Sequence, residues 1–424
     1  MMKKPGHAEN PYDVLIIGGG PAGMIAAGRA GEKGTKVLLI EKNDSLGKKL
    51  LITGGGRCNV TNAELDTRKF IAKLGASGKF LFSPLAKFGV SETLDFFHLK
   101  QMPTKVEAEK RAFPVSNKAQ SVWDTLVLYL KQNKVEVISD TPIIGFSKNG
   151  SKITGVKTSD GKIFRARKYI LATGGKSRPE TGSTGDGFVW LKELGHTVIE
   201  PDVALVPIKI KDIWVKQAQG VSFSNVRVSV FQNNALQFSR SGKILFTHFG
   251  LSGPLILNMS KDVSELIKYG EVKLSIDLFP NLDHLALDSH IRNIFETNQN
   301  KKLKNVFGLL VPPKIAASVL PLTSLDQEQY LNKISKDARL ALGKLFKQLY
   351  CQVDGFLGTE KAIVTSGGLV LEEINFKTMQ STKYSNLYCV GDVLNFDRPS
   401  GGYSLQICWT TGYTAGDHAS TNLN

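Results

Sequence analysis

The first forty residues alternate between apolar runs and a segment rich in small residues. Residues 12–17 and 37–40 are short apolar runs, and residues 24–29 between them are alanine-rich and helical in character. Two buried strands joined by one helix are typical of a βαβ unit in a parallel sheet. The pattern therefore predicts an α/β fold.

Further apolar runs extend this sheet. Residues 135–138 and 169–172 predict buried strands, and residues 153–163 predict a hairpin that turns at 159–161. Another buried strand is expected at 387–390, followed by a final helix that begins near Leu405. The expected architecture is a sheet decorated by a small β-meander.

The middle of the chain has a different pattern. Residues 196–278 show strand-length alternating segments separated by Gly and Asn turns, which predict an antiparallel β-domain. Residues 283–295 and 326–349 have helical spacing, with breaks at Pro312, Pro313 and Pro321. We therefore expect a helical insertion within the β-domain.

The glycines after the first strand are spaced as Gly18-x-Gly20-x-x-Gly23, with Pro21 and Ala22 inside the motif. Such a loop allows a tight turn, close approach of a pyrophosphate to the backbone, and close helix packing, and the helix N-terminus attracts phosphate. Glu41, which ends the second strand, suits a ribose diol, and an acid there disfavours a 2′-phosphate. The unit predicts binding of FAD or NAD.

Four further segments favour FAD. Residues 47–59 contain three consecutive glycines, which let the backbone lie against a flat ring, although a solvent loop is the alternative reading. Residues 172–175 and 388–392 each end a predicted strand, the first with glycines that expose the backbone and the second with Gly391 and the acidic Asp392. The helix that starts at 401–406 can point its N-terminus at the electron-rich N1–C2=O edge of a flavin. The predicted cofactor-binding residues are Gly18, Gly20, Pro21, Ala22, Gly23, Glu41, Lys42, Lys49, Thr53, Gly54, Gly55, Gly56, Arg57, Cys58, Asn59, Thr61, Thr173, Gly174, Gly175, Gly391, Asp392, Gly401, Gly402, Tyr403, Ser404, Leu405 and Gln406.

Long ordered motifs over almost the whole chain resemble those of one protein family. They are residues 54–62, 172–175 with 181–187, 245–254, 365–368 and 391–416. With these motifs the chain resembles the YhiN/BaiN-type FAD-dependent flavoproteins, whose members include aminoacetone oxidase-like enzymes, bile-acid-type reductases and ribosomal RNA dihydrouridine synthases. Two departures from the family pattern are the charges of Lys176 and Arg178 and an aspartate, Asp392, where many relatives have glutamate.

The resemblance implies a Rossmann-type, glutathione-reductase-like FAD-binding domain that is interrupted by an antiparallel β-barrel-like domain with a helical insertion. The expected boundaries are 1–195 and 357–424 for the FAD-binding domain, 196–280 and 348–356 for the barrel-like domain, and 281–347 for the insertion.

Composition and charge bear on the expected partners and on the expected cellular compartment. The chain carries 54 Lys and Arg against 38 Asp and Glu, which gives a net charge of +16. We therefore expect an anionic partner, and RNA is the first candidate. The alternative is a solvated basic surface that also suits the anionic cofactor. The four cysteines form no CxxC pair, and no metal site is predicted. Without an apolar run of membrane-spanning length, we expect a cytoplasmic protein with no membrane contact. The oligomeric state stays open.

Two side chains are candidates for proton transfer. Cys58 lies beside Arg57, which is expected to lower the pKa of its thiol, and the alternative role for Cys58 is a small residue packed in a tight loop. His248 follows a predicted strand and could exchange a proton near neutral pH or serve as a structural residue. Tyr403 is expected either to stack near the flavin ring or to form a wall of the final helix.

The leading hypothesis is an oxidoreductase in which NAD(P)H reduces FAD and the flavin N5 passes hydride to an activated C=C, with a ribosomal RNA uridine as one substrate. No second strand–GxGxxG–helix unit exists, so NAD(P)H is expected as a transient co-substrate. The alternatives are an oxygen-dependent oxidase of small amines or aminoketones, and a non-catalytic RNA-binding or redox-sensing flavoprotein.

Overall fold

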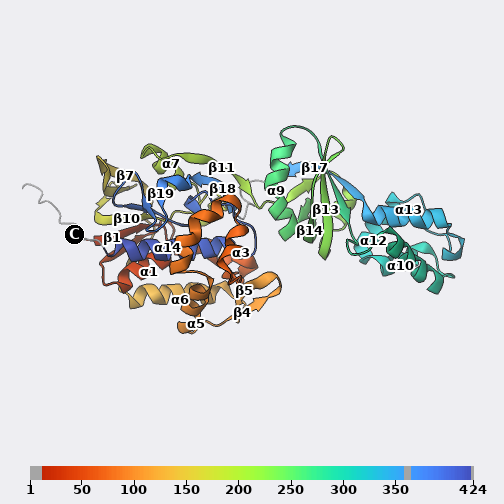
Figure 1. Ribbon diagram of the computed structural model, residues 1–424, viewed down its shortest axis with the longest axis horizontal. Coiled ribbons are helices and arrows are strands. Elements are labelled where there is room, and N and C mark those ends of the chain that lie inside the picture. The colour runs from red at the N-terminus through yellow and green to blue at the C-terminus, as the bar shows by residue number, and fades with distance from the viewer. Residues whose placement is uncertain (1–11, 358–363, 422–424) are drawn as a thin grey trace, which may run out of the picture. The chain divides into compact units, whose positions relative to one another are not determined.

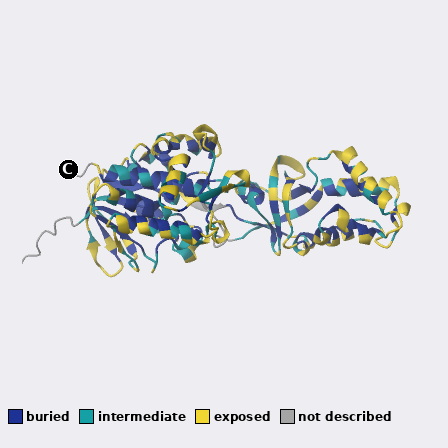
Figure 2. Ribbon diagram, turned by 90° about the horizontal axis from the view of Figure 1, so that it is seen from below, coloured by how far each residue is buried: buried dark blue, intermediate teal, exposed yellow. Residues whose placement is uncertain are grey.

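The structure is a computed structural model that describes residues 12–357 and 364–421 (Figure 1). It divides into two compact units. The sheet unit comprises Met1–Val203 and Ile363–Asn424, and the barrel unit comprises Ala204–Ala362. Each unit has its own hydrophobic core, and Figure 2 shows the buried stretches inside each unit.

A seven-stranded sheet forms the centre of the sheet unit. Its strand order is β19-β20-β21-β10-β1-β2-β6, in which β21, β10, β1, β2 and β6 are parallel and the β19–β20 edge is antiparallel. The strands are β1 (Tyr12–Ile17), β2 (Val37–Ile40), β6 (Glu136–Ile138), β10 (Ala166–Leu171), β19 (Ile374–Asn375), β20 (Gln380–Ser381) and β21 (Leu387–Cys389). This parallel sheet confirms the predicted Rossmann-type α/β fold.

Smaller elements surround the sheet. The meander β7 (Ile143–Asn149), β8 (Lys152–Thr158) and β9 (Ile163–Phe164) contains the expected hairpin. The other helices and strands of this unit are α2 (Lys48–Ile52), α3 (Thr67–Ala72), α4 (Phe82–Lys87), α5 (Val90–Leu99), α6 (Ala119–Gln132), α7 (Asp186–Glu193), β3 (Thr61–Asn62), β4 (Thr104–Glu107), β5 (Arg111–Pro114) and β18 (Val364–Leu369), the last paired with β11 (Val198–Ala204).

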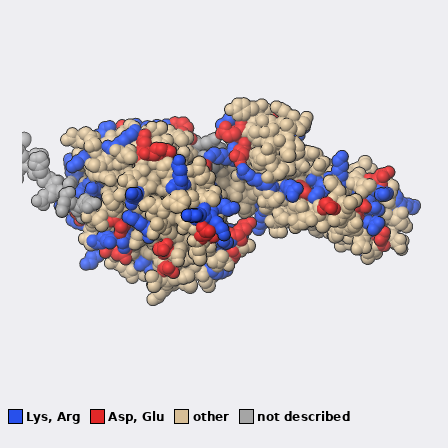
Figure 3. Space-filling model, viewed as in Figure 1, with Lys and Arg blue, Asp and Glu red and all other residues tan. Residues whose placement is uncertain are grey.

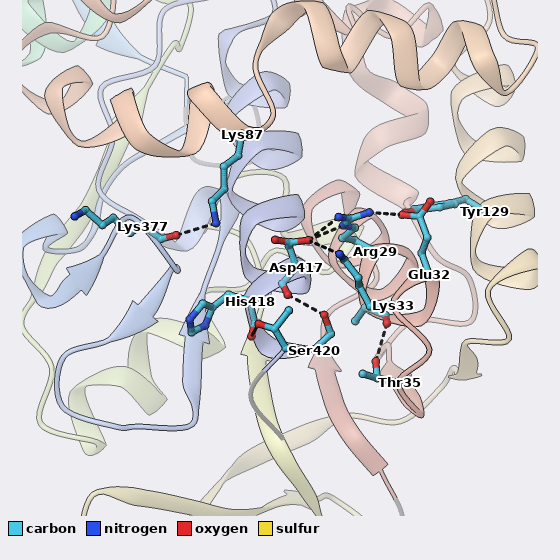
Figure 4. A network of polar contacts seen from close by, with 12 residues as sticks. Arg29, Glu32, Lys33, Thr35, Lys87, Tyr129, Lys377, Asp417, His418 and Ser420 are labelled. Carbon is cyan, nitrogen blue, oxygen red and sulfur yellow. Dashed lines mark hydrogen bonds and ion pairs between the residues drawn. The ribbon is translucent and has the colours of Figure 1, made fainter. Parts of the chain in front are cut away.

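The first and last helices pack directly against each other. They are α1 (Pro21–Glu32) and α14 (Tyr403–Ala419). A Cβ added to Gly412 or Gly416 of α14 would lie 2.4 or 2.3 Å from a carbonyl oxygen of α1, so only glycine permits this approach. Arg29 of α1 donates through Nε (3.0 Å) and Nη2 (2.6 Å) to Asp417 Oδ1 of α14, as Figure 4 shows. Helices α1 and α14, which are far apart in the sequence, therefore pack side by side.

Six strands close into a barrel in the second unit, in the order β12-β15-β14-β13-β16-β17. They are β12 (Ile208–Ile210), β13 (Ser222–Gln232), β14 (Ala235–Thr247), β15 (Gly250–Ser252), β16 (Val272–Asp277) and β17 (Leu349–Phe356). The unit also contains α8 (Ile213–Gln217) and α9 (Pro254–Ile267). The helix α9 lies in a stretch that the alternation pattern assigned to β-structure, and its start is Pro254 at the first helical position.

Four helices lie between β16 and β17. They are α10 (His284–Thr297), α11 (Leu303–Leu310), α12 (Pro313–Val319) and α13 (Lys336–Lys347). The helix expected to begin at residue 326 begins only at Lys336, where the Ser335 side chain accepts a hydrogen bond from the Ala338 N–H and caps the helix. The predicted break at Pro312 and Pro313 separates α11 from α12, and Pro313 is the first residue of α12.

Candidate functional site

The glycine loop after β1 combines tight packing with one open position. An added Cβ at Gly18 (φ +104°) would lie 2.6 Å from the Ala172 oxygen, and one at Gly23 would lie 1.9 Å from the Gly18 oxygen. Gly20, which directly precedes Pro21 and Ala22 at the start of α1, has φ −76°, and an added Cβ there would meet no protein atom within 4 Å. The helix N-terminus and the open side of Gly20 leave room for a pyrophosphate.

Glu41 holds this loop from the end of β2. Its side chain is buried; Oε2 accepts from the Gly19 N–H (2.7 Å), and Oε1 accepts from the backbone N–H (2.8 Å) and the side-chain amide (2.7 Å) of Asn43. The carboxylate therefore orients the phosphate loop in addition to lying where a ribose diol is expected.

An open cavity lies at the carboxyl ends of β1, β2 and β10. Thr173 Oγ1 is buried in its lining and has no hydrogen-bond partner among residues 12–357 and 364–421. Lys42 closes one side through bonds to Thr184 Oγ1 (2.5 Å) and Asp186 Oδ2 (2.8 Å). The lining residues are Ile17, Gly18, Ile40, Glu41, Lys42, Thr141, Ile143, Thr173, Gly182, Thr184, Gly185, Asp186 and Trp190.

Part of this lining was not predicted as binding residues. Residues 181–187 carry the family resemblance but were not among the predicted binding residues, and Gly182, Thr184 and Gly185 form one wall of the cavity. The dense run of glycine and threonine in this segment is the sequence signal that could have identified it as part of the site. Thr141 and Trp190 come from a loop and from α7 and carried no local signal.

The glycine run after α2 exposes bare backbone. Gly54, Gly55 and Gly56 have φ values of 56°, 68° and 84°, all are exposed, and added Cβ atoms at Gly55 and Gly56 would meet no atom within 4 Å. At the start of the run the Thr53 hydroxyl donates to the Leu50 oxygen (2.6 Å). The buried Oδ1 of Asn59 has no hydrogen-bond partner among the described residues. The run thus offers an open backbone surface beside an unused acceptor.

Arg57 points away from Cys58. Its guanidinium donates to Glu107 (2.5 Å) and Asn117 (2.6 Å) and lies 4.1 Å from the centre of the Phe113 ring. Burial raises the pKa of the Cys58 thiol to about 12. The prediction that Arg57 lowers this pKa is therefore wrong, because adjacency in sequence does not bring the guanidinium to the sulfur. A role of Cys58 in proton transfer stays a prediction.

Asp392 belongs to a buried polar cluster at the end of β21. Its Oδ1 accepts from the Ser404 hydroxyl (3.0 Å) and lies 3.4 Å from Nε of Arg398, whose side chain is fully buried. Lys49 donates to the Ser177 hydroxyl (2.6 Å), and burial lowers its pKa although Asp392 acts in the opposite direction. The cluster unites predicted site residues from α2, β21 and α14.

Close contacts tie the separate glycine segments together. A Cβ on Gly391 (φ +73°) would lie 2.8 Å from the Ala22 Cβ, and one on Gly402 (φ +101°) would lie 2.4 Å from the backbone carbon of Thr61. Gly401 also has a positive φ of 112°. After β10, Gly174 has φ +74° and Gly175 is buried. The glycines at 391 and 402 thus lie directly against the phosphate loop and β3, respectively.

The first turn of α14 is held by buried contacts. Gln406 is fully buried, accepts from the Thr61 hydroxyl (2.6 Å) and donates to the Gly89 oxygen (3.0 Å). The Tyr403 ring is buried with its centre 4.8 Å from the Phe70 ring, and Leu405 is buried as well. These side chains support the helix start from behind, so for Tyr403 the contacts favour the wall of the helix.

His248 lies in the barrel unit. It is exposed in the turn between β14 and β15, and its ring is 4.9 Å from the Phe249 ring. Contact of His248 with a substrate or flavin stays a prediction.

The profile of the family described as HI0933-like protein Rossmann domain matches residues 12–418. The chain belongs to the HI0933-like family. This confirms the resemblance to the YhiN/BaiN-type proteins, and FAD is the cofactor of these HI0933-like oxidoreductases.

Two curated relatives match the HI0933-like chain over nearly its full length. A 3-dehydro-bile acid delta(4,6)-reductase of Clostridium scindens is 29% identical over 96% of this chain and 98% of its own. A ribosomal RNA dihydrouridine synthase of Escherichia coli is 27% identical over 95% of this chain and 96% of its own. A 3-ketosteroid-delta4-(5alpha)-dehydrogenase of Rhodococcus jostii shares the fold, with a TM-score of 0.55 and 14% identity over 98% of this chain and 99% of its own.

The open positions of the site agree with FAD as the cofactor. Gly20, Gly55 and Gly56 present backbone without a neighbour, and Thr173 and Asn59 carry unused buried polar atoms. No helix in the described part of the chain has the length and apolar character needed to cross a membrane.

Proposed function

We propose that this flavoprotein is an NAD(P)H-dependent reductase that saturates an activated C=C bond, with a uridine of ribosomal RNA as its substrate. The names of both full-length relatives support reduction of such a bond, since one is a delta(4,6)-reductase and the other makes dihydrouridine. These two names suggest different substrates, a bile acid and an RNA.

The positive charge of the chain favours the RNA. A net charge of +16 suits a polyanion, because each phosphate that a cation neutralises releases a counterion. Figure 3 shows lysine and arginine side chains on the visible face of each unit. A single bile acid has no need of so many cations.

The reaction balances with one hydride and one proton. NAD(P)H supplies two electrons and a hydrogen nucleus, a proton comes from solvent or a side chain, and the products are NAD(P)⁺ and dihydrouridine. Conjugate addition places the hydride on C6 of uracil and the proton on C5. Bound FAD supplies the hydride chemistry between the two substrates.

Backbone and side-chain groups of the sheet unit would hold FAD and polarise it. The N-terminus of α1 and the open backbone at Gly20 suit the pyrophosphate, and Glu41 suits the ribose. The N-terminus of α14, which follows Gly402, carries the positive end of a helix dipole and stabilises negative charge nearby. The fully buried guanidinium of Arg398 adds positive charge beside Asp392, whereas burial lowers the pKa of Lys49 and so disfavours its charged form.

A test combines the purified FAD-loaded protein with NADH or NADPH and an unmodified ribosomal RNA transcript. We expect dihydrouridine in the nucleosides analysed by mass spectrometry. Absence of dihydrouridine while NAD(P)H bleaches the flavin would overturn the uridine substrate. Hydrogen peroxide formed with small amines would indicate the oxidase, and reduction of a bile-acid enone would indicate a small-molecule reductase.

A further inference from the structure

Two aromatic rings lie on the outer face of the barrel. Phe231 on β13 and Tyr350 on β17 have ring centres 6.0 Å apart at an interplanar angle of 62°, and Tyr350 is 50% exposed. Their neighbours Val230 and Cys351 point to the opposite face and are buried in the barrel core. The rings therefore lie outside the core that the barrel needs for folding.

The strand register adds an apolar side chain and a cation to these rings. Leu236 on β14 pairs with Phe231 and is 57% exposed, and Lys273 on β16 pairs with Phe231 on one side and Gln352 on the other. We call Phe231, Leu236, Lys273 and Tyr350 the aromatic strand face. β13, β14 and β17 are labelled in Figure 1.

The charges on this face favour an anion. Lys273 is exposed and forms no ion pair with any described residue, and the same holds for Arg227, which lies four residues before Phe231 on the same side of β13. Asp277, opposite Arg227, is buried and its charge is offset by Lys347 at 2.7 Å. Two exposed carboxylates lie at the borders of this face: Glu271 comes two residues before Lys273, and Asp354 lies four residues beyond Tyr350, about 13 Å along the strand.

The exposed ring of Tyr350 and the half-buried ring of Phe231, next to lysine and arginine, are suited to unpaired nucleotides. Bases stack on aromatic side chains while the backbone phosphates meet the cations. A base-paired duplex hides its base faces and offers no such stacking. The excess of positive charge over the whole chain agrees with a polyanionic ligand.

We propose that the aromatic strand face binds an unpaired stretch of RNA. This inference rests on the proposed function in taking RNA as the ligand, and it assigns part of the recognition to the barrel unit. A uridine in a loop or single strand, rather than in a duplex, is then the favoured substrate.

The test measures RNA binding by the full-length FAD-loaded protein without NAD(P)H. The probe is a short fluorescein-labelled single-stranded RNA followed by fluorescence anisotropy, with the same strand annealed to its complement for comparison. Stacking contributes about 1–3 kcal/mol per base, so Tyr350→Ala and Phe231→Ala are each expected to weaken Kd about 5- to 150-fold. Tyr350→Phe keeps the ring and is expected to bind as the wild type does.

Two further variants separate stacking from charge. Lys273→Gln is expected to reduce the salt slope of binding by about 0.7. Tyr269→Ala is the matched control, because Tyr269 is 77% exposed in the same unit and outside this face. Circular dichroism and FAD content show that each variant is folded.

Unchanged RNA affinity in both Tyr350→Ala and Phe231→Ala would overturn the inference, as would an equal loss in Tyr269→Ala. A change in molar mass by light scattering with unchanged RNA affinity would assign the face to a second copy of the chain and also overturn it. Specific loss of RNA binding in a protein that forms no dihydrouridine would reject the proposed function and keep this inference.

Discussion

Replacing Gly20 by alanine tests the pyrophosphate position directly. Gly20 has φ −76° and ψ −178°, which alanine adopts without strain, and the added Cβ meets no protein atom within 4 Å. The reduced freedom of the unfolded chain stabilises the variant by about 0.4–1 kcal/mol. Alanine is a poorer N-cap than glycine by a similar amount, so the free energy of unfolding of the apoprotein is expected to change by less than about 1 kcal/mol.

FAD binding by Gly20→Ala is expected to weaken at least tenfold, a loss of about 1.4 kcal/mol, because the methyl group occupies the side from which the pyrophosphate approaches. The assay combines denaturant unfolding of the apoprotein with FAD titration followed by flavin fluorescence. Gly308→Ala on α11 is the control, since its Cβ also meets no atom and its φ is not positive. Wild-type FAD affinity in a folded Gly20→Ala protein would refute the assignment of the pyrophosphate to this loop.

Three further predictions concern buried polar groups. Glu41→Gln loses at least one charge-assisted hydrogen bond to the phosphate loop and should lower the free energy of unfolding, measured in urea, by about 1.5–3 kcal/mol. The control Glu265→Gln changes an exposed side chain and should alter the free energy of unfolding by less than about 1 kcal/mol. Equal effects of the two substitutions would contradict the role of Glu41. Burial raises the pKa of all four cysteine thiols, so a disulfide reagent at pH 8 should label none in the native protein and four after unfolding; fast native labelling would be inconsistent with this burial. Burial lowers the pKa of His196 below its ordinary 6.5, so the stabilising contribution of neutral His196 is fully present above pH 6.5 and is lost as the pH falls below it. In urea unfolding between pH 6.5 and 5, His196→Gln should remove a pH dependence of up to about 1.4 kcal/mol per pH unit from the free energy of unfolding. An unchanged pH dependence would assign the effect to other groups.

Local signals were sufficient for the phosphate loop and the sheet strands. Each depends on a short apolar run, a glycine spacing or a terminal acid, and β1 (Tyr12–Ile17) and β2 (Val37–Ile40) have the predicted bounds. In such segments the residues adjacent in the sequence determine the backbone conformation. The Rossmann-type fold was therefore predictable from the sequence.

Side-chain directions were not predictable in this way. Arg57 is adjacent to Cys58 but pairs with Glu107, which is distant in sequence, and burial then decides the pKa of the thiol. Thr141 and Trp190 reach the cavity only because tertiary packing brings their elements to the end of β2. The α9 helix was missed because its apolar spacing overlaps that of neighbouring strands.

The contact of α1 with α14 has a consequence for biosynthesis. The helix that starts at the phosphate loop packs against a helix that is translated after the whole barrel unit, and β21, which pairs with the inner strand β10, also follows the barrel unit in the chain. The barrel unit is contiguous and is complete while these partners are still missing. Vectorial synthesis therefore orders the folding, with the barrel unit first, and the chain gains its cofactor only after translation of α14.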